Sequence, residues 1–88
     1  MFLLINIYSS DIIPPYVTAV HSFKSYDEAE KEMLEYMRYA YSIYHKEWED
    51  DKKHGYVYRE PYIDRDDATC THFICGHDYK DIWQIYQK

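Results

Sequence analysis

The chain has 88 residues, with 16 acidic against 10 basic side chains and a formal net charge of −6. This length predicts one domain, residues 1–88, and a content of 47% hydrophobic and 19% aromatic residues excludes a disordered chain, a fibrous repeat and a Gly/Ser linker. Acidity without a basic stripe argues against direct binding to nucleic acid or to an anionic membrane, and favours a basic protein as partner.

The apolar start of the chain does not have the form of a secretory signal. Its first basic residue is Lys24, and the apolar run is interrupted at Asn6. No stretch reaches the roughly 18 apolar residues that a membrane-spanning helix needs. Cys70 and Cys75 would lie about 16 Å apart in an extended strand, too far for a disulfide. Free thiols indicate a reducing compartment, so we expect a cytoplasmic protein.

Two strands joined by a long turn are predicted at the start of the chain. Residues 1–8 and 16–23 are rich in β-branched and aromatic side chains, and the second run places Val17, Ala19 and Phe23 on one face. Between them, residues 9–15 end in Pro14 and Pro15, which cannot donate to a strand ladder. The pattern predicts an antiparallel hairpin.

A long helix is predicted from residue 26 to about residue 52. Ser25 and Glu28 have the spacing of a capping box, in which the serine accepts from the backbone amide three residues later. Lys52, Lys53 and Gly55 are typical of a helix end. At 1.5 Å per residue the helix would be about 40 Å long, so its last turns are expected to project. Its buried stripe is formed by Tyr26, Ala29, Met33, Met37, Ala40, Tyr44 and Trp48.

The remainder of the chain predicts short strands. We expect a short strand at 56–58, an acidic loop at 63–67, a strand at 68–75, a turn at 76–78 and a closing strand at 79–86. The predicted fold is therefore α+β: an antiparallel sheet of four to five strands with one long helix packed across it, in the order ββαβ(β)β.

Tyrosine is the strongest anomaly of composition, with 12 residues in 88. One interpretation is that a small core uses tyrosine where a larger one would use leucine, with each hydroxyl reaching water. The other is a recognition surface, since tyrosine offers a rigid ring and a polar tip. Tyr36, Tyr39 and Ile43 fall on a flank of the helix away from its buried stripe, and they are the candidate apolar anchors for a partner.

Carboxylates cluster at three places in the sequence: the first half of the helix, its end and the following loop. Such runs usually form a solvated surface. Acids at the end of a helix nevertheless oppose its dipole, so a binding role for them is also considered. Carboxylates arranged in this way can imitate phosphates and occupy a basic nucleic-acid channel. The candidate partner-binding acids are Glu28, Glu32, Glu35, Glu49, Asp50, Asp51, Asp64, Asp66 and Asp67.

A metal site is the alternative suggested by the last third of the chain. Cys70, His72, Cys75 and His77 offer four ligands within eight residues, and His54 is a further histidine. The spacing differs from the usual two distant ligand pairs of zinc modules. The alternative function is a small zinc-binding or regulatory module built on these four residues.

Catalytic signatures are missing from the sequence. A Cys/His pair such as Cys75 with His77 or His54 has no third orienting group that the sequence identifies. There is no phosphate-cradling glycine motif, and the chain contains only 2 glycines. We expect a protein that is not an enzyme and that needs no cofactor.

The general plan resembles small proteins of bacteriophages and mobile elements. The similar features are the start Phe2-Leu3-Leu4-Ile5, the passage from Ser22-Phe23 into Tyr26-Asp27-Glu28-Ala29-Glu30, and the ending Asp81-Ile82-Trp83-Gln84-Ile85. Some proteins of this kind are anti-CRISPRs, which are small, often acidic, and block Cas effectors at their nucleic-acid-binding surfaces. The resemblance carries no functional residue across, because that class shares neither fold nor motif.

Together these observations predict a non-enzymatic inhibitor of the anti-CRISPR type. It would occupy the nucleic-acid-binding surface of a basic bacterial defence protein, such as a Cas effector, in the host cytoplasm. Carboxylates would steer the encounter, and the exposed rings of the helix would anchor it. A homodimer is a further possibility, with the tyrosine flank as its contact.

Overall fold

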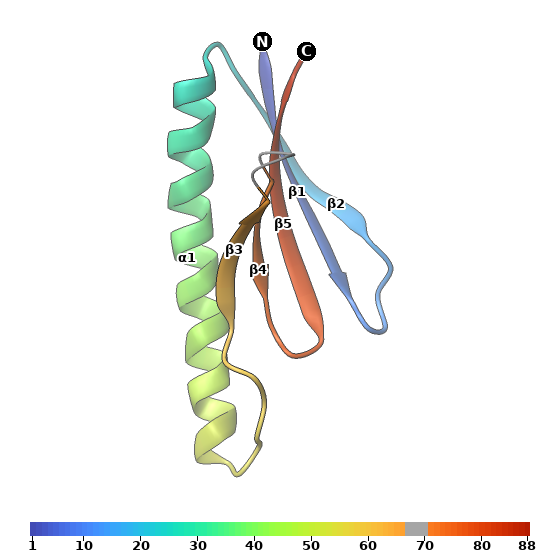
Figure 1. Cartoon of the computed structure of the whole chain (residues 1–88), viewed down its shortest axis with the longest axis vertical. Helices are drawn as coiled ribbons and strands as arrows, with labels where there is room; N and C mark the ends of the chain where they lie inside the picture. The colour runs from blue at the N-terminus through green and yellow to red at the C-terminus, as the bar shows by residue number, and fades with distance from the viewer. Residues whose placement is uncertain (67–70) are drawn as a thin grey trace.

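The computed structural model describes residues 1–66 and 71–88 and arranges them as ββαβββ (Figure 1). The predicted fold class is confirmed, because one helix packs against a five-stranded antiparallel sheet. The elements are β1 (Phe2–Ser10), β2 (Tyr16–Phe23), α1 (Tyr26–Lys53), β3 (Tyr62–Asp66), β4 (Thr71–Cys75) and β5 (Tyr79–Gln87).

The sheet has the strand order β2-β1-β5-β4-β3, with every neighbouring pair antiparallel. The first and last strands of the chain therefore lie side by side at the middle of the sheet. Their pairing runs from Phe2 opposite Gln87 to Ser10 opposite Tyr79, and the Lys88 amide donates to the Met1 carbonyl at 2.9 Å. Figure 1 shows both termini at the same end of the molecule, near the start of α1.

The core lies between α1 and one face of the sheet. Met33 and Met37 of the helix pack against Leu4, Ile74 and Trp83 of the strands. These five side chains are at most 6% exposed. They are brought together from four elements, and the central part of the predicted helix stripe is confirmed as the buried one.

Both ends of α1 have the predicted residues. The hydroxyl of Ser25 accepts from the backbone amide of Glu28 at 3.2 Å, which satisfies one of the amides that a helix start leaves unpaired. At the other end the His54 amide donates to the carbonyls of Asp50 and Asp51. Gly55 follows with a φ of 89°, a left-handed conformation that glycine adopts without strain.

We expect Ser25→Ala to lower the free energy of unfolding by about 1 kcal/mol, because it removes the side-chain cap of the helix. Urea unfolding followed by far-UV circular dichroism measures the effect. Ser42→Ala is the matched control, since it also removes an exposed serine hydroxyl from α1 but leaves both helix ends intact. An unchanged stability of the Ser25 variant would show that the cap contributes nothing.

The predicted strand at 56–58 is wrong, and so is the predicted loop at 63–67 over its described part, residues 63–66. Residues 54–61 run back along α1 without strand pairing: the Trp48 indole donates to the Tyr58 carbonyl at 2.9 Å, and the Tyr41 hydroxyl donates to the Pro61 carbonyl at 3.3 Å. These helix contacts use carbonyls that a strand ladder would need. The third strand is β3 instead, in which Ile63 lies opposite Ile74 of β4.

Smaller differences concern the ends of the strands. β1 continues two residues further than predicted, to Ser10, because Ser9 and Ser10 pair with Lys80 and Tyr79. The predicted strand 68–75 is observed as β4 over its described part. Asp67 and Cys70 lie outside the described residues.

The last turns of α1 project beyond the sheet, as predicted. The helix has 28 residues, or about 42 Å at 1.5 Å per residue, whereas β1 and β5 have 9 residues each, or about 30 Å. Figure 1 shows the helix continuing past the strands at the end away from the termini, with residues 54–61 alongside it. Within the described residues, no helix combines the length and the apolar character that crossing a membrane requires.

Candidate partner-binding surfaces

The helix start and middle carry the largest group of predicted site residues. Tyr39 is 70% exposed and Ile43 is 42% exposed, so both predicted anchors are accessible. Carboxylates spaced three or four residues apart accompany them along the same side of the helix. We call this surface the helix flank, and it comprises Glu28, Glu32, Glu35, Tyr36, Tyr39, Ile43 and Asp50.

Tyr36 differs from the other two anchors because it is held against the sheet. Its ring stacks on His21 of β2 at 5.4 Å between centroids and on Trp83 of β5 at 5.5 Å. The side chain thereby joins the helix flank to the core. Tyr36 is still 37% exposed, close to the 42% of Ile43, whereas Tyr39 is exposed over 70% of its surface.

The three predicted acids at the end of α1 point to different sides. Glu49 lies 3.3 Å from the His45 ring, whose other nitrogen is 2.8 Å from Glu60. Asp50 belongs to the helix flank, whereas Asp51 is half-buried and lines a cavity beneath the helix. A run of adjacent acids on a helix cannot form one patch, because successive residues are rotated by about 100°.

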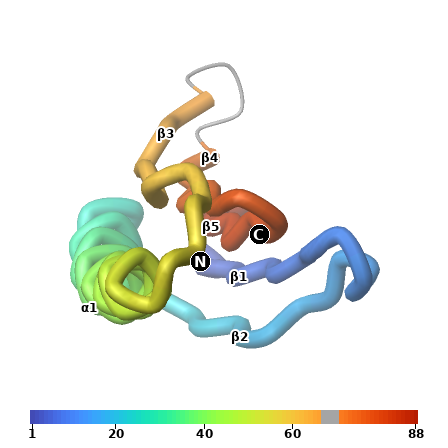
Figure 2. Tube along the Cα trace, turned by 90° about the horizontal axis from the view of Figure 1, so that it is seen from below, coloured from blue at the N-terminus to red at the C-terminus, as the bar shows by residue number. Residues whose placement is uncertain are grey.

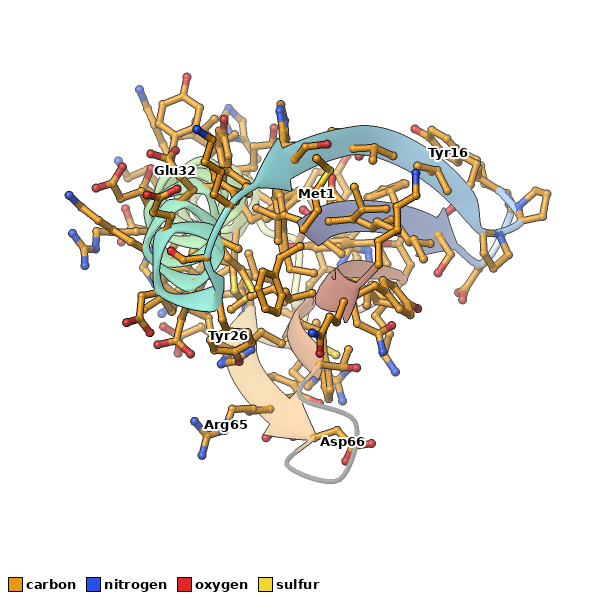
Figure 3. All side chains as sticks on the ribbon, turned by 90° about the horizontal axis from the view of Figure 1, so that it is seen from above. Met1, Tyr16, Tyr26, Glu32, Arg65 and Asp66 are labelled. Atoms are coloured by element: carbon orange, nitrogen blue, oxygen red, sulfur yellow. The ribbon has the colours of Figure 1, made fainter. Side chains whose placement is uncertain are left out.

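Asp64 and Asp66 lie far from the helix flank. Both belong to β3, the edge strand at the opposite side of the sheet from β2. Figure 3 shows Glu32 and Asp66 on opposite sides of the molecule. The predicted acids are therefore divided between the helix flank and β3, with Glu49 and Asp51 belonging to neither surface.

The Cys/His group is not brought to one place within the described residues. His72 and Cys75 are three positions apart on β4, so their side chains leave opposite faces of the sheet. His77 stacks on the Tyr58 ring at 3.9 Å, and the His54 ring contacts the Asp50 carbonyl at 2.7 Å. Residues 1–66 and 71–88 contain no group of three or more side chains placed to hold a metal ion.

Sequence reasoning missed the apolar face of the sheet that α1 leaves open. The register places alternate residues of the five strands on the side away from the helix, and Figure 2 shows no described element over that side. Val17 and Val20 are 56% and 53% exposed there. The prediction that Val17 shares a face with Ala19 and Phe23 is wrong, because the register of β2 shifts beside Asn6 and Ile7. The apolar members of this open face include Leu3, Ile5, Ile7, Val17, Val20, Phe73, Ile82 and Tyr86.

A signal for the open face was present in the first strand. Leu3, Leu4, Ile5 and Ile7 are apolar at both odd and even positions, whereas a strand with one wet face alternates apolar and polar residues. The core uses only Leu4 of these four. Strands without alternation are typical of a sheet that is covered on both sides.

A second missed feature is a buried polar cluster beside the core. Asp81 is 4% exposed, and its carboxylate accepts from the Asn6 amide at 2.6 Å and from the Tyr44 hydroxyl at 2.9 Å. Thr18 donates in turn to the Asn6 side-chain carbonyl. Burial raises the pKa of Asp81, although the hydrogen bonds from Asn6 and Tyr44 act in the opposite direction.

Comparison of the chain with protein-family models, with curated proteins and with solved structures found no match.

Proposed function

We propose that this protein acts by binding a basic protein, without catalysis, and that the helix flank is the surface that binds. The observation that carries the proposal is the combination on this flank of accessible apolar side chains, Tyr39 and Ile43, with surrounding carboxylates such as Glu32 and Glu35. Aromatic and apolar anchors supply most of the affinity in protein interfaces, and surrounding charges supply steering and specificity.

The partner class follows from the charge of the chain. A net charge of −6 repels nucleic acids and attracts proteins with a basic surface, such as proteins that bind nucleic acids. In its narrowest form the proposal is an anti-CRISPR-like inhibitor that occupies the nucleic-acid-binding surface of a Cas effector in the bacterial cytoplasm. What supports this form is the resemblance of the sequence together with the acidic helix flank.

The experiment is affinity capture from a nuclease-treated bacterial lysate on the immobilised protein, with elution by a salt gradient and identification by mass spectrometry. We expect one or a few basic nucleic-acid-handling proteins, released at moderate salt. Glu32→Gln/Glu35→Gln should reduce their recovery about tenfold if the two lost charge pairs contribute about 0.7 kcal/mol each.

Asp64→Asn/Asp66→Asn is the matched control, since it removes the same two charges from the other acidic surface. We expect it to retain the captured proteins. Equal losses in both double variants would mean that total charge and not the helix flank determines binding. Captured proteins that are not basic, or that salt does not release, would contradict the proposal.

A further inference from the structure

A cavity of about 230 Å³ lies beneath the projecting half of α1. Its walls come from that half of the helix, from residues 58–61, from the turn between β4 and β5, and from Tyr8 of β1. Figure 1 shows these segments in the half of the molecule away from the termini. The volume is below the roughly 300–1,000 Å³ of sites for drug-sized ligands, so it suits a single side-chain headgroup.

The walls of the cavity are largely aromatic. Tyr79 lies against Tyr44 at 4.7 Å between ring centroids and is stacked with Tyr8 at 6.3 Å. On the other side Tyr58 is backed by His77, and Trp48 is fixed by its indole hydrogen bond to the Tyr58 carbonyl. We call this set of five rings the aromatic cage; its members are Tyr8, Tyr44, Trp48, Tyr58 and Tyr79.

Glycine at position 76 allows Tyr79 to take its place in the cage. A Cβ atom at Gly76 would overlap the Tyr79 ring, closer than real Cβ contacts come. The Gly76 amide also donates to the Tyr79 carbonyl at 3.0 Å. The backbone of the turn between β4 and β5 therefore fixes the position of Tyr79, which forms one wall of the cavity.

The cage is surrounded by more negative than positive charge. Glu47, Asp51 and Asp78 line the cavity, and no cation within the described residues forms an ion pair with Glu47 or Asp51. The guanidinium of Arg59 is already engaged, since it donates to the Gly76 carbonyl at 2.9 Å and lies 5.3 Å from the centre of the Tyr62 ring. The cavity is thus lined by three carboxylates and by one guanidinium that already has other contacts.

The tyrosines of the cage respond to this negative charge. The pKa values of Tyr8, Tyr44 and Tyr79 are all raised, first by burial and then by nearby carboxylates. Asp81 contributes to all three shifts, and Glu47 contributes to those of Tyr8 and Tyr79. Burial opposes a charge of either sign, but the contribution of the carboxylates to these shifts favours a bound positive charge.

We infer that the aromatic cage binds the side-chain cation of a lysine or arginine from the partner protein, an inference that rests on the proposed function. Rings within about 6 Å of a cation attract it through their negative faces, and nearby carboxylates neutralise it. The chain already shows such a contact on the outside of the cage, where the Lys52 ammonium lies 5.2 Å from the centre of the Trp48 ring.

The position of the cage fits a partner seated on the helix flank. Glu47 lies one helical turn after Ile43 and belongs both to the cavity and to a shallower hollow that opens toward Tyr16 and Thr18 of β2. The hollow is on the β2 side of the helix, where His21 contacts Tyr36. A partner anchored on Ile43 can therefore extend a basic side chain past Glu47 into the cage.

The test is to titrate blocked amino acids, as probes, into the whole ¹⁵N-labelled protein and to monitor binding by ¹⁵N–¹H spectra. N-acetyl-lysine methylamide and N-acetyl-arginine methylamide carry the cation, and N-acetyl-norleucine methylamide is the neutral control. We expect the cationic probes to shift the Trp48 indole resonance saturably at millimolar concentrations, as befits one isolated side chain. The indole of Trp83, in the core, is the internal reference.

Glu47→Gln/Asp51→Asn should weaken binding of the cationic probes about fivefold or more, because it removes the two unpaired carboxylates. Glu32→Gln/Glu35→Gln removes the same charge from the helix flank and should leave the probe affinity within about twofold. Equal shifts with the norleucine probe, or no saturation by the cations up to about 50 mM, would overturn the inference. Much tighter binding of tetramethylammonium would assign the cage to a free small cation instead of a side chain.

The outcome of the probe titration is independent of the outcome of the capture experiment. Probe binding without any captured basic protein would leave the cation site standing and contradict the proposed function. Salt-sensitive capture without probe binding would leave the proposed function standing and overturn the inference.

Discussion

Met33→Ala is expected to lower the free energy of unfolding by about 3 kcal/mol. Met33 is fully buried at the middle of α1, where it packs against residues of β1, β4 and β5. Truncation removes its buried side-chain atoms and leaves a cavity that these strands cannot fill, since they are fixed by their hydrogen-bonded pairing. Urea unfolding monitored by circular dichroism gives the value.

Leu34→Ala is the matched control for this core substitution. Leu34 is the next residue along the helix and is 45% exposed, so its truncation leaves no internal cavity. Alanine also has the higher helix propensity, and we expect a change within about 0.5 kcal/mol. Similar losses at positions 33 and 34 would contradict the packing of the helix on the sheet.

The helix could be predicted because its signals are local. The cap at Ser25, the stripe through Met33 and Met37, and the stop at Gly55 each lie within a few residues of the feature that they specify. The two strands before it and β5 after it were also recognised from their own residues. One long helix between strands then leaves few alternatives to a helix packed across a sheet.

β3 could not be predicted from its own residues. All five residues of its sequence Tyr-Ile-Asp-Arg-Asp are exposed and three of them are charged, which is typical of a loop. It forms a strand because β4 presents a free edge, and charged side chains on an edge strand oppose further pairing. In contrast, residues 56–58 have strand propensity but lie against the helix, where Trp48 holds the Tyr58 carbonyl.

Only the part of the candidate surfaces that lies on the helix could be predicted from the sequence. The spacing of Tyr39 and Ile43 along one side of α1 is a property of the sequence, and both side chains are exposed. The aromatic cage depends on residues 8, 48, 58 and 79, which only the tertiary fold brings together. The positions of these residues in the sequence do not indicate that their side chains lie close together in the fold.

The polar cluster around Asp81 makes the free energy of unfolding depend on pH. Burial raises the pKa of Asp81 above its ordinary value of 3.8, so the folded protein takes up this proton before the unfolded chain does as the pH falls. This group therefore adds stability as the pH falls through its raised pKa, and the gain is complete below about 3.8. Asp81→Asn should remove this component of the pH profile.

Tyr44→Phe is expected to cost about 2 kcal/mol of stability near neutral pH, because it removes a hydrogen bond to a buried carboxylate. The Tyr44 hydroxyl donates to Asp81 at 2.9 Å and helps to keep its pKa down, so the loss raises that pKa further. When Asp81 is protonated the carboxylate no longer needs the donor. The cost should therefore shrink as the pH falls toward 4, as measured by urea unfolding across the pH range.

Tyr41→Phe distinguishes this electrostatic effect from the loss of a hydroxyl in general. Tyr41 is also half-buried on α1, but it donates to the neutral Pro61 carbonyl at 3.3 Å. We expect a cost of about 1 kcal/mol or less that does not change between neutral pH and pH 4. If the two phenylalanine variants had parallel pH profiles, the ionised Asp81 would not be the acceptor that Tyr44 stabilises. A profile that converges only for Tyr44→Phe would identify the buried carboxylate as the group that couples the helix to the centre of the sheet.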